Sequence, residues 1–339
     1  MTKHFSIAAL AGTILAAASS PAWADKANPV IGVTAYDMSS FISFGKLGVE
    51  AVAKADHAKV LWNSAHMDVN NQISQIQQFT NQKVDAIVIA AVNSATLGPQ
   101  VAAAKAAGIP VVITNLTVSP ATQADAVSYV GPDDVAAGRN EAEHLISAIG
   151  GKGGVVVLQG PLGQSGEIDR TKGIRQALAK HPDVKLLAIQ PANWKRTEAY
   201  SVAQDFLSRY GSKIDGVISE NDDMAIGTIQ ALREKGLAGK IPVVGVDGIK
   251  DGMRAVRNGN EIETDLQDGP LELGMATQVA VDAAQGKPVP KEALFIMPEI
   301  TKSNVAHYYQ QMFVAPQKFI DDLPALVNKN LASGQYAEQ

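Results

Sequence analysis

Short apolar runs alternate with amphipathic helical segments along nearly the whole chain of 339 residues, and this alternation restricts the folds that the chain can adopt. Runs such as 86–90 (AIVIA) and 154–159 (GVVVLQ) are almost wholly apolar, as strands are when helices cover both faces of a parallel sheet. Helical segments of about 10–15 residues separate most of them, which predicts an open, doubly wound α/β architecture. The expected strands are residues 30–34, 59–63, 86–90, 110–114, 127–130, 154–159, 184–190, 216–220, 242–246 and 262–266.

Ten strands are too many for one compact sheet in a chain of this length, so the sequence favours two such sheets over a single (β/α)8 barrel. A break is expected near Gly131-Pro132, where Asp133 has the character of a helix N-cap. Residues 70–81 form a clear amphipathic helix pattern, and residues 222–235 form another that ends at Gly236.

The first 24 residues have the pattern of a cleaved secretory signal peptide. Lys3 and His4 precede an apolar run over residues 5–18, and Ala22-Trp23-Ala24 supplies small residues at a cleavage point. The alternative of a membrane anchor is disfavoured, because spanning a bilayer takes about 20 apolar residues. The chain has no cysteine, which excludes disulfides, thiolate catalysis and a lipid anchor on cysteine. We therefore expect an exported protein that is soluble outside the cytoplasm.

Several functional classes leave no trace in the sequence. The formal net charge is −5 without a basic run, so nucleic acid is not an expected partner. There is no P-loop, no dinucleotide-binding glycine pattern, no H-E-x-x-H and no G-x-S-x-G, so we predict no catalytic residue, no cofactor and no metal site. The glycine-rich turn 160–166 (GPLGQSG) is more consistent with a plain strand-to-helix loop than with an anion site.

Polar and aromatic side chains gather after the expected strands, where open α/β sheets bind their ligands. Each has an ordinary structural explanation as a helix cap, a turn residue or a core residue. Together they describe a site for a small, neutral, hydroxyl-rich ligand, because charged groups bond hydroxyls strongly and aromatic faces cover carbon–hydrogen faces. The candidate ligand-binding residues are Asp37, Phe41, Asn115, Arg170, Trp194, Asn221, Asp247 and Gln267.

The chain resembles periplasmic sugar-binding proteins of the ribose-binding type, the receptors of ABC importers, over roughly residues 28–305. The motifs are 220–227 (ENDDMAIG), 243–252 (VVGVDGIKDG), 169–174 (DRTKGI), 109–114 (IPVVIT) and 300–305 (ITKSNV). The resemblance implies that Asn221, Asp247 and Arg170 contact a sugar and that Trp194 stacks on it. It also implies that Gln267 contacts the ligand near the hinge and that Phe41 is the aromatic residue that opens the first helix.

The same resemblance implies two doubly wound lobes joined by three chain crossings, which close around the ligand. The crossings are expected near Gly131-Pro132, near 267–269 and near 297–298. The first lobe would hold residues 27–130 with 270–296, and the second 131–269 with 297–339. The last part of the chain, with Phe319 and Leu323 at helical spacing, is expected to form a packing helix.

Two departures from the ribose-binding type bear on the ligand. Asn115-Leu116 stands where that type carries Asp-Arg, and Ile42 takes the place of a second phenylalanine. A linear or cyclic polyol or a less common sugar is therefore expected, bound by a monomer that delivers it to a membrane permease. The competing hypotheses are a secreted sugar-processing enzyme and a LacI-type sugar-sensing core, which would need a DNA-binding headpiece.

Overall fold

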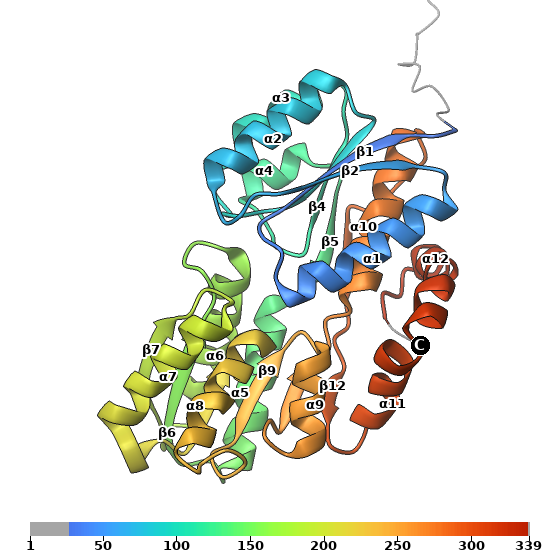
Figure 1. Ribbon diagram of the computed structural model, residues 1–339. Coiled ribbons are helices and arrows are strands. Elements are labelled where there is room, and N and C mark those ends of the chain that lie inside the picture. The colour runs from blue at the N-terminus through green and yellow to red at the C-terminus, as the bar shows by residue number, and fades with distance from the viewer. Residues whose placement is uncertain (1–26, 338–339) are drawn as a thin grey trace, which may run out of the picture.

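The computed structural model describes residues 27–337, so the expected signal peptide at 1–24 lies outside the described residues. All ten expected strands are present, with ends within two residues of the prediction. They belong to two six-stranded sheets, each flanked by helices, stacked one above the other in Figure 1. The fold class predicted from the sequence, two doubly wound lobes, is confirmed.

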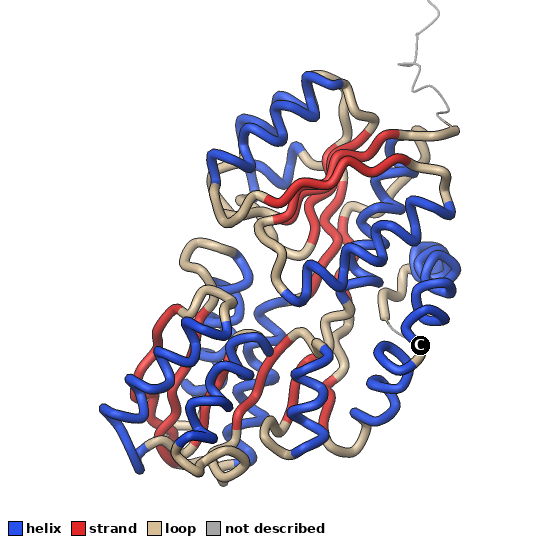
Figure 2. Tube along the Cα trace, in the orientation of Figure 1, coloured by secondary structure: helices blue, strands red, loops and turns tan. Residues whose placement is uncertain are grey.

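The first sheet has the strand order β11-β5-β4-β3-β1-β2, and all of its pairs are parallel. Helices α2, α3 and α4 lie on one side of it, and α1 and α10 lie on the other (Figures 1 and 2). Its elements are β1 (Val30–Ala35), α1 (Ser40–Ala55), β2 (Lys59–Ser64), α2 (Val69–Gln82), β3 (Ala86–Ala90), α3 (Gly98–Ala106), β4 (Val111–Thr114), α4 (Pro120–Asp125), β5 (Ser128–Pro132), α10 (Gly269–Ala284) and β11 (Glu292–Phe295).

The second sheet has the order β12-β10-β9-β8-β6-β7, in which only the edge strand β12 runs antiparallel to its neighbour. Its elements are α5 (Asp134–Ala148), β6 (Gly153–Gln159), α6 (Ser165–Lys180), β7 (Val184–Pro191), α7 (Arg196–Tyr210), η1 (Gly211–Lys213), β8 (Gly216–Ser219), α8 (Asp222–Glu234), β9 (Val243–Val246), α9 (Lys250–Asn258), β10 (Glu263–Asp265) and β12 (Glu299–Thr301).

Local sequence explains where several helices begin. The Asp68, Asp133 and Asn221 side chains cap α2, α5 and α8 by accepting hydrogen bonds from backbone N–H groups one turn ahead. The cap predicted at Asp133 is confirmed. Gly236, just past α8, has a φ of +65°, which suits the left-handed helix stop expected there.

The chain passes between the sheets three times: from β5 to α5, from β10 to α10, and from β11 to β12. After β12 it continues through α11 (Val305–Tyr309), the π-helical turn η2 (Gln310–Val314) and α12 (Pro316–Ser333). Parallel sheets bind ligands beyond the carboxyl ends of their strands, and the loops after β1, β4, β6 and β7 all lie between the lobes in Figure 1.

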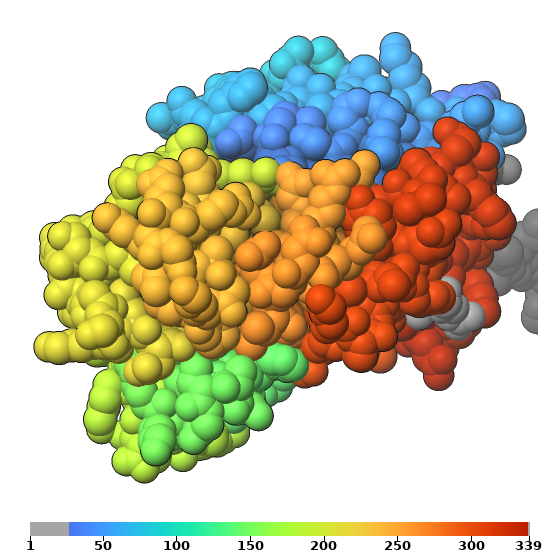
Figure 3. Space-filling model, turned by 60° about the horizontal axis from the view of Figure 1, so that its bottom comes forward, coloured from blue at the N-terminus to red at the C-terminus, as the bar shows by residue number. Residues whose placement is uncertain are grey.

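The placement of the C-terminal segment in the second lobe was wrong for its last helix. Helix α11 contacts α9 of the second lobe, but α12 packs against α1 and α10 of the first. Its buried residues Phe319, Leu323 and Val327 face those helices, and the Phe319 ring stacks on Phe44 of α1 with centroids 6.4 Å apart. The segment therefore lies against both lobes, as the red surface in Figure 3 shows.

Candidate functional site

Arg170 lies at the centre of a buried polar network between the lobes. Its Nε donates to Asp134 Oδ1 at 2.8 Å, and its two terminal nitrogens donate to the Glu220 carbonyl oxygen at 2.5 Å and to Gln267 Oε1 at 2.9 Å. Asp247 Oδ1 lies 3.8 Å from the same guanidinium group. Helix α6 delivers this arginine from its second turn, so the rigid helix and three hydrogen bonds fix its orientation.

Asn221 and Asp247 adjoin this arginine from the ends of β8 and β9. Asn221 Nδ2 donates to Asp247 Oδ2 at 3.3 Å, while Asn221 Oδ1 caps α8 by accepting from the Met224 N–H at 3.0 Å. The capping role and membership of the site are thus compatible for Asn221. Both side chains are nearly inaccessible in this closed arrangement.

Gln267 connects the second-lobe network to the first lobe. It lies just after β10, at a chain crossing, and its Nε2 donates to Glu272 Oε2 at 2.8 Å. Glu272 belongs to the first turn of α10, and the Asn115 side chain, which follows β4, faces the same carboxyl group. Hydrogen bonds therefore join Arg170 to Gln267 and Asn221 to Asp247, the ion pair of Arg170 with Asp247 links the two pairs, and Asn115 lies beside them.

Trp194 is buried against the glycine-rich turn rather than free in the loop. Its Nε1 donates to Gln164 Oε1 at 2.7 Å, and its ring lies 5.6 Å from the Arg170 guanidinium carbon. A Cβ on Gly160 would meet this ring at 1.9 Å, so glycine is needed there. The turn 160–166 thus makes room for the indole, as expected of a structural loop.

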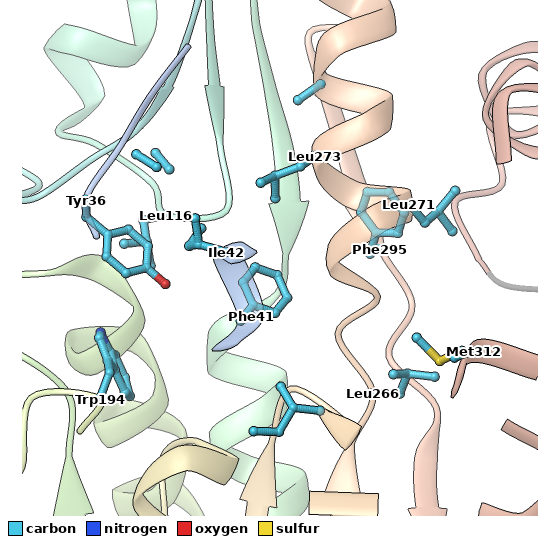
Figure 4. Packing of buried hydrophobic residues seen from close by; sticks show 14 of the residues in the cluster. Tyr36, Phe41, Ile42, Leu116, Trp194, Leu266, Leu271, Leu273, Phe295 and Met312 are labelled. Atoms are coloured by element: carbon cyan, nitrogen blue, oxygen red, sulfur yellow. The ribbon is translucent and has the colours of Figure 1, made fainter. Parts of the chain in front are cut away.

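Asp37 and Phe41 lie outside the hydrogen-bonded network. Asp37 is half-buried on a groove of about 280 Å³ that Tyr36 and Trp194 also line. Figure 4 shows the Tyr36 ring and Trp194 on opposite sides of the space between the lobes, with Phe41 near Ile42. Phe41 is buried beside Gly269, where a Cβ would lie 3.2 Å from its ring.

Three of the predicted residues hold a backbone conformation that side chains other than glycine rarely adopt. The φ angles of Asn115, Trp194 and Asp247 are +64°, +59° and +116°. Such conformations cost on the order of 1–3 kcal/mol each and persist where the surrounding structure imposes them, often at functional sites. All three residues lie in the loops that follow strands, after β4, β7 and β9.

Burial controls the protonation of the site. It raises the pKa of Glu220 and of Glu272 to about 8, and it raises the pKa of Asp247 well above its usual value. Burial alone would lower the pKa of Arg170, but Asp134 and Asp247 raise it. The site therefore holds one fixed positive charge among carboxyl groups whose protonated form is favoured by burial.

The lobes touch across the site. Gln164 Nε2 donates to the Ala91 carbonyl oxygen at 3.3 Å, and the Ser94 N–H donates to the Gly163 carbonyl oxygen at 3.1 Å. At another point of the interface Ser40 Oγ donates to Asp223 Oδ1 at 3.0 Å. These bonds join the first lobe to the second and describe a closed arrangement.

Sequence reasoning did not select Asp134, Gln164, Glu220 or Glu272 as site residues. Glu220 stands in the motif 220–227 and could have been found there, and Asp134 directly follows the predicted cap Asp133. Glu272 carries no such signal, because an acidic residue in the first turn of a helix is common for electrostatic reasons alone. In residues 27–337 no group of three or more His, Cys, Asp or Glu side chains is arranged to hold a metal ion.

No helix within residues 27–337 is long and apolar enough to cross a membrane.

Comparison with known proteins matches residues 31–288 to the periplasmic binding protein domain. The xylitol-binding protein of Mycolicibacterium smegmatis is 48% identical over 91% of this chain and 87% of its own. The ribose import binding protein of Salmonella typhimurium is 31% identical over 70% of this chain and 79% of its own. A Bacillus halodurans ABC transporter solute-binding protein with bound myo-inositol superposes with a TM-score of 0.79 at 27% identity, covering 84% and 99% of the two chains.

These relatives are binding proteins, which favours the predicted binding role over an enzyme or a LacI-type core. The resemblance deduced from the motifs is confirmed along most of the chain. The chain belongs to the periplasmic binding protein family, as an ABC-transporter solute-binding protein of the ribose-binding type.

Proposed function

We propose that this protein captures a neutral acyclic polyol of the xylitol class in the periplasm and delivers it, as a monomer, to a membrane permease. The observation that carries the proposal is the 48% identity to a xylitol-binding protein over 91% of the chain. The lining agrees with it: Asn115 and Leu116 put a carboxamide and an apolar side chain on the first-lobe wall, and an acyclic polyol offers hydroxyls without an anomeric centre.

In this proposal different residues of the site make different contacts with the ligand. Arg170, Asn221 and Asp247 bond ligand hydroxyls from the second lobe, and Trp194 covers the carbon chain. Asn115, Phe41 and Asp37 act from the first lobe, with Gln267 at the crossing. Charged groups make stronger hydrogen bonds to hydroxyls than neutral groups do, and aromatic faces bury carbon–hydrogen surface.

Hinge closure would follow from contacts that both lobes make with one ligand. A ligand can shift an open–closed equilibrium only by its difference in affinity for the two states. Here the difference would arise because both lobes contact the ligand only in the closed state. The proposed lobes are residues 27–130 with 270–296 and residues 131–269 with 297–304, with the segment from 305 onward spanning both.

The test is calorimetric titration of purified protein, freed of co-purified solutes by unfolding and refolding, with xylitol, D-arabitol, D-ribose, D-allose and myo-inositol. We expect a five-carbon polyol to bind at least about tenfold more tightly than either aldose, a difference of about 1.4 kcal/mol. Tighter binding of ribose or allose would refute the polyol assignment while leaving the binding-protein family intact.

A further inference from the structure

One carboxyl oxygen of the interlobe site has no hydrogen-bonding partner among residues 27–337. It is Oε1 of Glu272, on a residue only 1% exposed. The other oxygen of this carboxyl group accepts from Gln267 Nε2 at 2.8 Å, and Asn115 faces the group without a well-formed bond to Oε1. Buried polar atoms in folded proteins are nearly always paired, so an unpaired one calls for an explanation.

A purely structural role explains only one of the two oxygen atoms of this carboxyl group. Holding Gln267 in place requires one acceptor, which Oε2 supplies. A glutamine or a shorter side chain could do the same without burying a second oxygen, and leaving that oxygen unsatisfied is costly. The cost is recovered when a hydrogen-bonding partner enters between the lobes.

The position of Glu272 fits a contact with ligand. Gln267 lies on one side of its carboxyl group and Asn115 on another, and both are candidate ligand-binding residues from separate segments of the chain. Gln267 in turn accepts from Arg170 at the centre of the network. The free oxygen is therefore set among the groups that the proposed ligand would meet from the first lobe.

We propose that Glu272 is a ligand-binding residue, whose free oxygen hydrogen-bonds one hydroxyl group of a neutral polyhydroxylated ligand. This inference rests on the proposed function and adds a residue and a selection rule to it. Glu272 supplies a carboxyl group on the first-lobe side, and it selects a ligand that carries a hydroxyl group at this point.

The chemistry of a buried carboxyl group supports that selection. Burial raises the pKa of Glu272 to about 8, opposed by the hydrogen bond from Gln267, so the group is mainly protonated at neutral pH. A protonated carboxyl group both donates and accepts, as a hydroxyl does. A ligand hydroxyl group can therefore accept a hydrogen bond from Glu272 or donate one to it, whereas Arg170 Nε already donates to Asp134.

The experiment compares Glu272→Leu and Glu272→Gln with Thr277→Val, a control on the same helix. Thr277 is buried, but its hydroxyl donates to the Leu273 carbonyl oxygen inside α10 and is not part of the network. Binding of the tightest ligand from the polyol and sugar panel is measured by calorimetry, and folding is checked by thermal denaturation. We expect Glu272→Leu to bind about tenfold more weakly or worse, Glu272→Gln within about threefold of wild type, and the control unchanged.

Monodeoxy analogues of the same ligand separate a ligand contact from a structural effect. In the wild type, removal of one particular hydroxyl should weaken binding about tenfold, whereas Glu272→Leu should bind that analogue and the parent equally. If the leucine variant does not fold, Glu272→Gln keeps the test, because whatever affinity it loses must be lost for the parent ligand and not for that one analogue.

Three results would overturn the proposal. The first is an affinity of Glu272→Leu within about twofold of wild type, since losing a bond to a buried acid costs more than that. The second is an equal loss for the parent and every deoxy analogue. The third is a wild type that binds nothing in the panel, which would also refute the proposed function, whereas the first two leave that function standing.

Discussion

Raising the pH from about 5 to about 7.5 should weaken the fold, because the second lobe buries carboxyl groups that hold protons. Glu263 and Asp265 lie on β10 and Glu141 lies on α5, and none of their carboxyl oxygens makes a well-formed hydrogen bond among the described residues. Burial raises the pKa of Asp265 to about 8, with Glu299 raising it further and Arg170 opposing. Burial likewise raises the pKa values of Glu263 and Glu141.

The sign of the effect follows from the pH at which the folded chain and the unfolded chain each release the proton of Asp265. Below about pH 4 Asp265 is protonated in the folded and the unfolded chain, so its contribution to stability is fully present. Between about pH 4 and pH 8 the unfolded chain has released the proton that the folded chain still holds, so stability is lost as pH rises. A difference of one proton changes the free energy of unfolding by about 1.4 kcal/mol per pH unit, or about 3 kcal/mol between pH 5 and 7.5.

Other groups with shifted pKa values do not cancel this dependence of the free energy of unfolding on pH. Burial raises the pKa of Asp222 to about 7, which acts in the same direction. The pKa of Asp251 is lowered by its hydrogen bond with Arg196, and the stability from this carboxylate is lost only below the window, at more acidic pH. The measured slope should therefore have the sign set by the buried carboxyl groups.

Urea unfolding followed by tryptophan fluorescence at the two pH values measures this difference. Asp265→Asn keeps the shape of the side chain and removes the titration, so its free energy of unfolding should depend less on pH and should exceed that of wild type at pH 7.5. Asp322→Asn, at an exposed position on α12, is the control and should leave the slope unchanged. Equal wild-type stability at both pH values, or a wild-type slope in Asp265→Asn, would refute the argument.

Two further substitutions test the packing of the site and of the C-terminal segment. Trp194→Ala should bind the panel ligand about tenfold to a hundredfold more weakly, since it removes one large apolar face, and calorimetry would contradict this if affinity were unchanged. Because Trp194 also bonds Gln164, the same variant should denature at a lower temperature even without ligand. Phe319→Ala should reduce the free energy of unfolding by about 3–5 kcal/mol, the usual cost of emptying a buried phenylalanine site, and an unchanged urea midpoint would show that α12 does not stabilise the first lobe.

The sequence predicted the interior and one edge strand of each sheet, β2 and β7, and missed the other edge strand of each. Strands such as β3 are apolar throughout, and only burial on both faces explains such a run. The missed strands β11 and β12 are short: β11 alternates exposed and buried residues, and β12 has three residues. Edge strands need little apolar surface, so their pattern does not differ from that of a loop. The helical spacing of residues in α12 likewise indicated a buried face but not which lobe would cover it.

For the site, the sequence identified positions at strand ends but not the partners that hold them. Trp194 was expected to offer a free face to ligand, and its bond to Gln164 depends on a turn that lies thirty residues earlier in the chain. Glu272 was missed because its local context is that of any first helical turn. Its role arises only when α10 is brought beside Gln267 and Asn115, a juxtaposition set by the chain crossing and not by spacing.

In the proposed function the two lobes would contribute to binding in different ways. Arg170, Asn221 and Asp247 hold one another in place within the second lobe, so that lobe can present oriented groups before any ligand arrives. The free oxygen of Glu272 lies on the first-lobe side, and in our proposal it would gain a partner only when ligand is enclosed. Bonds that form only on closure set how far a ligand can shift the hinge equilibrium, so first-lobe contacts should govern closure more than initial capture. Gln267, bonded to both Arg170 and Glu272, is the residue through which the two halves of the site are coupled.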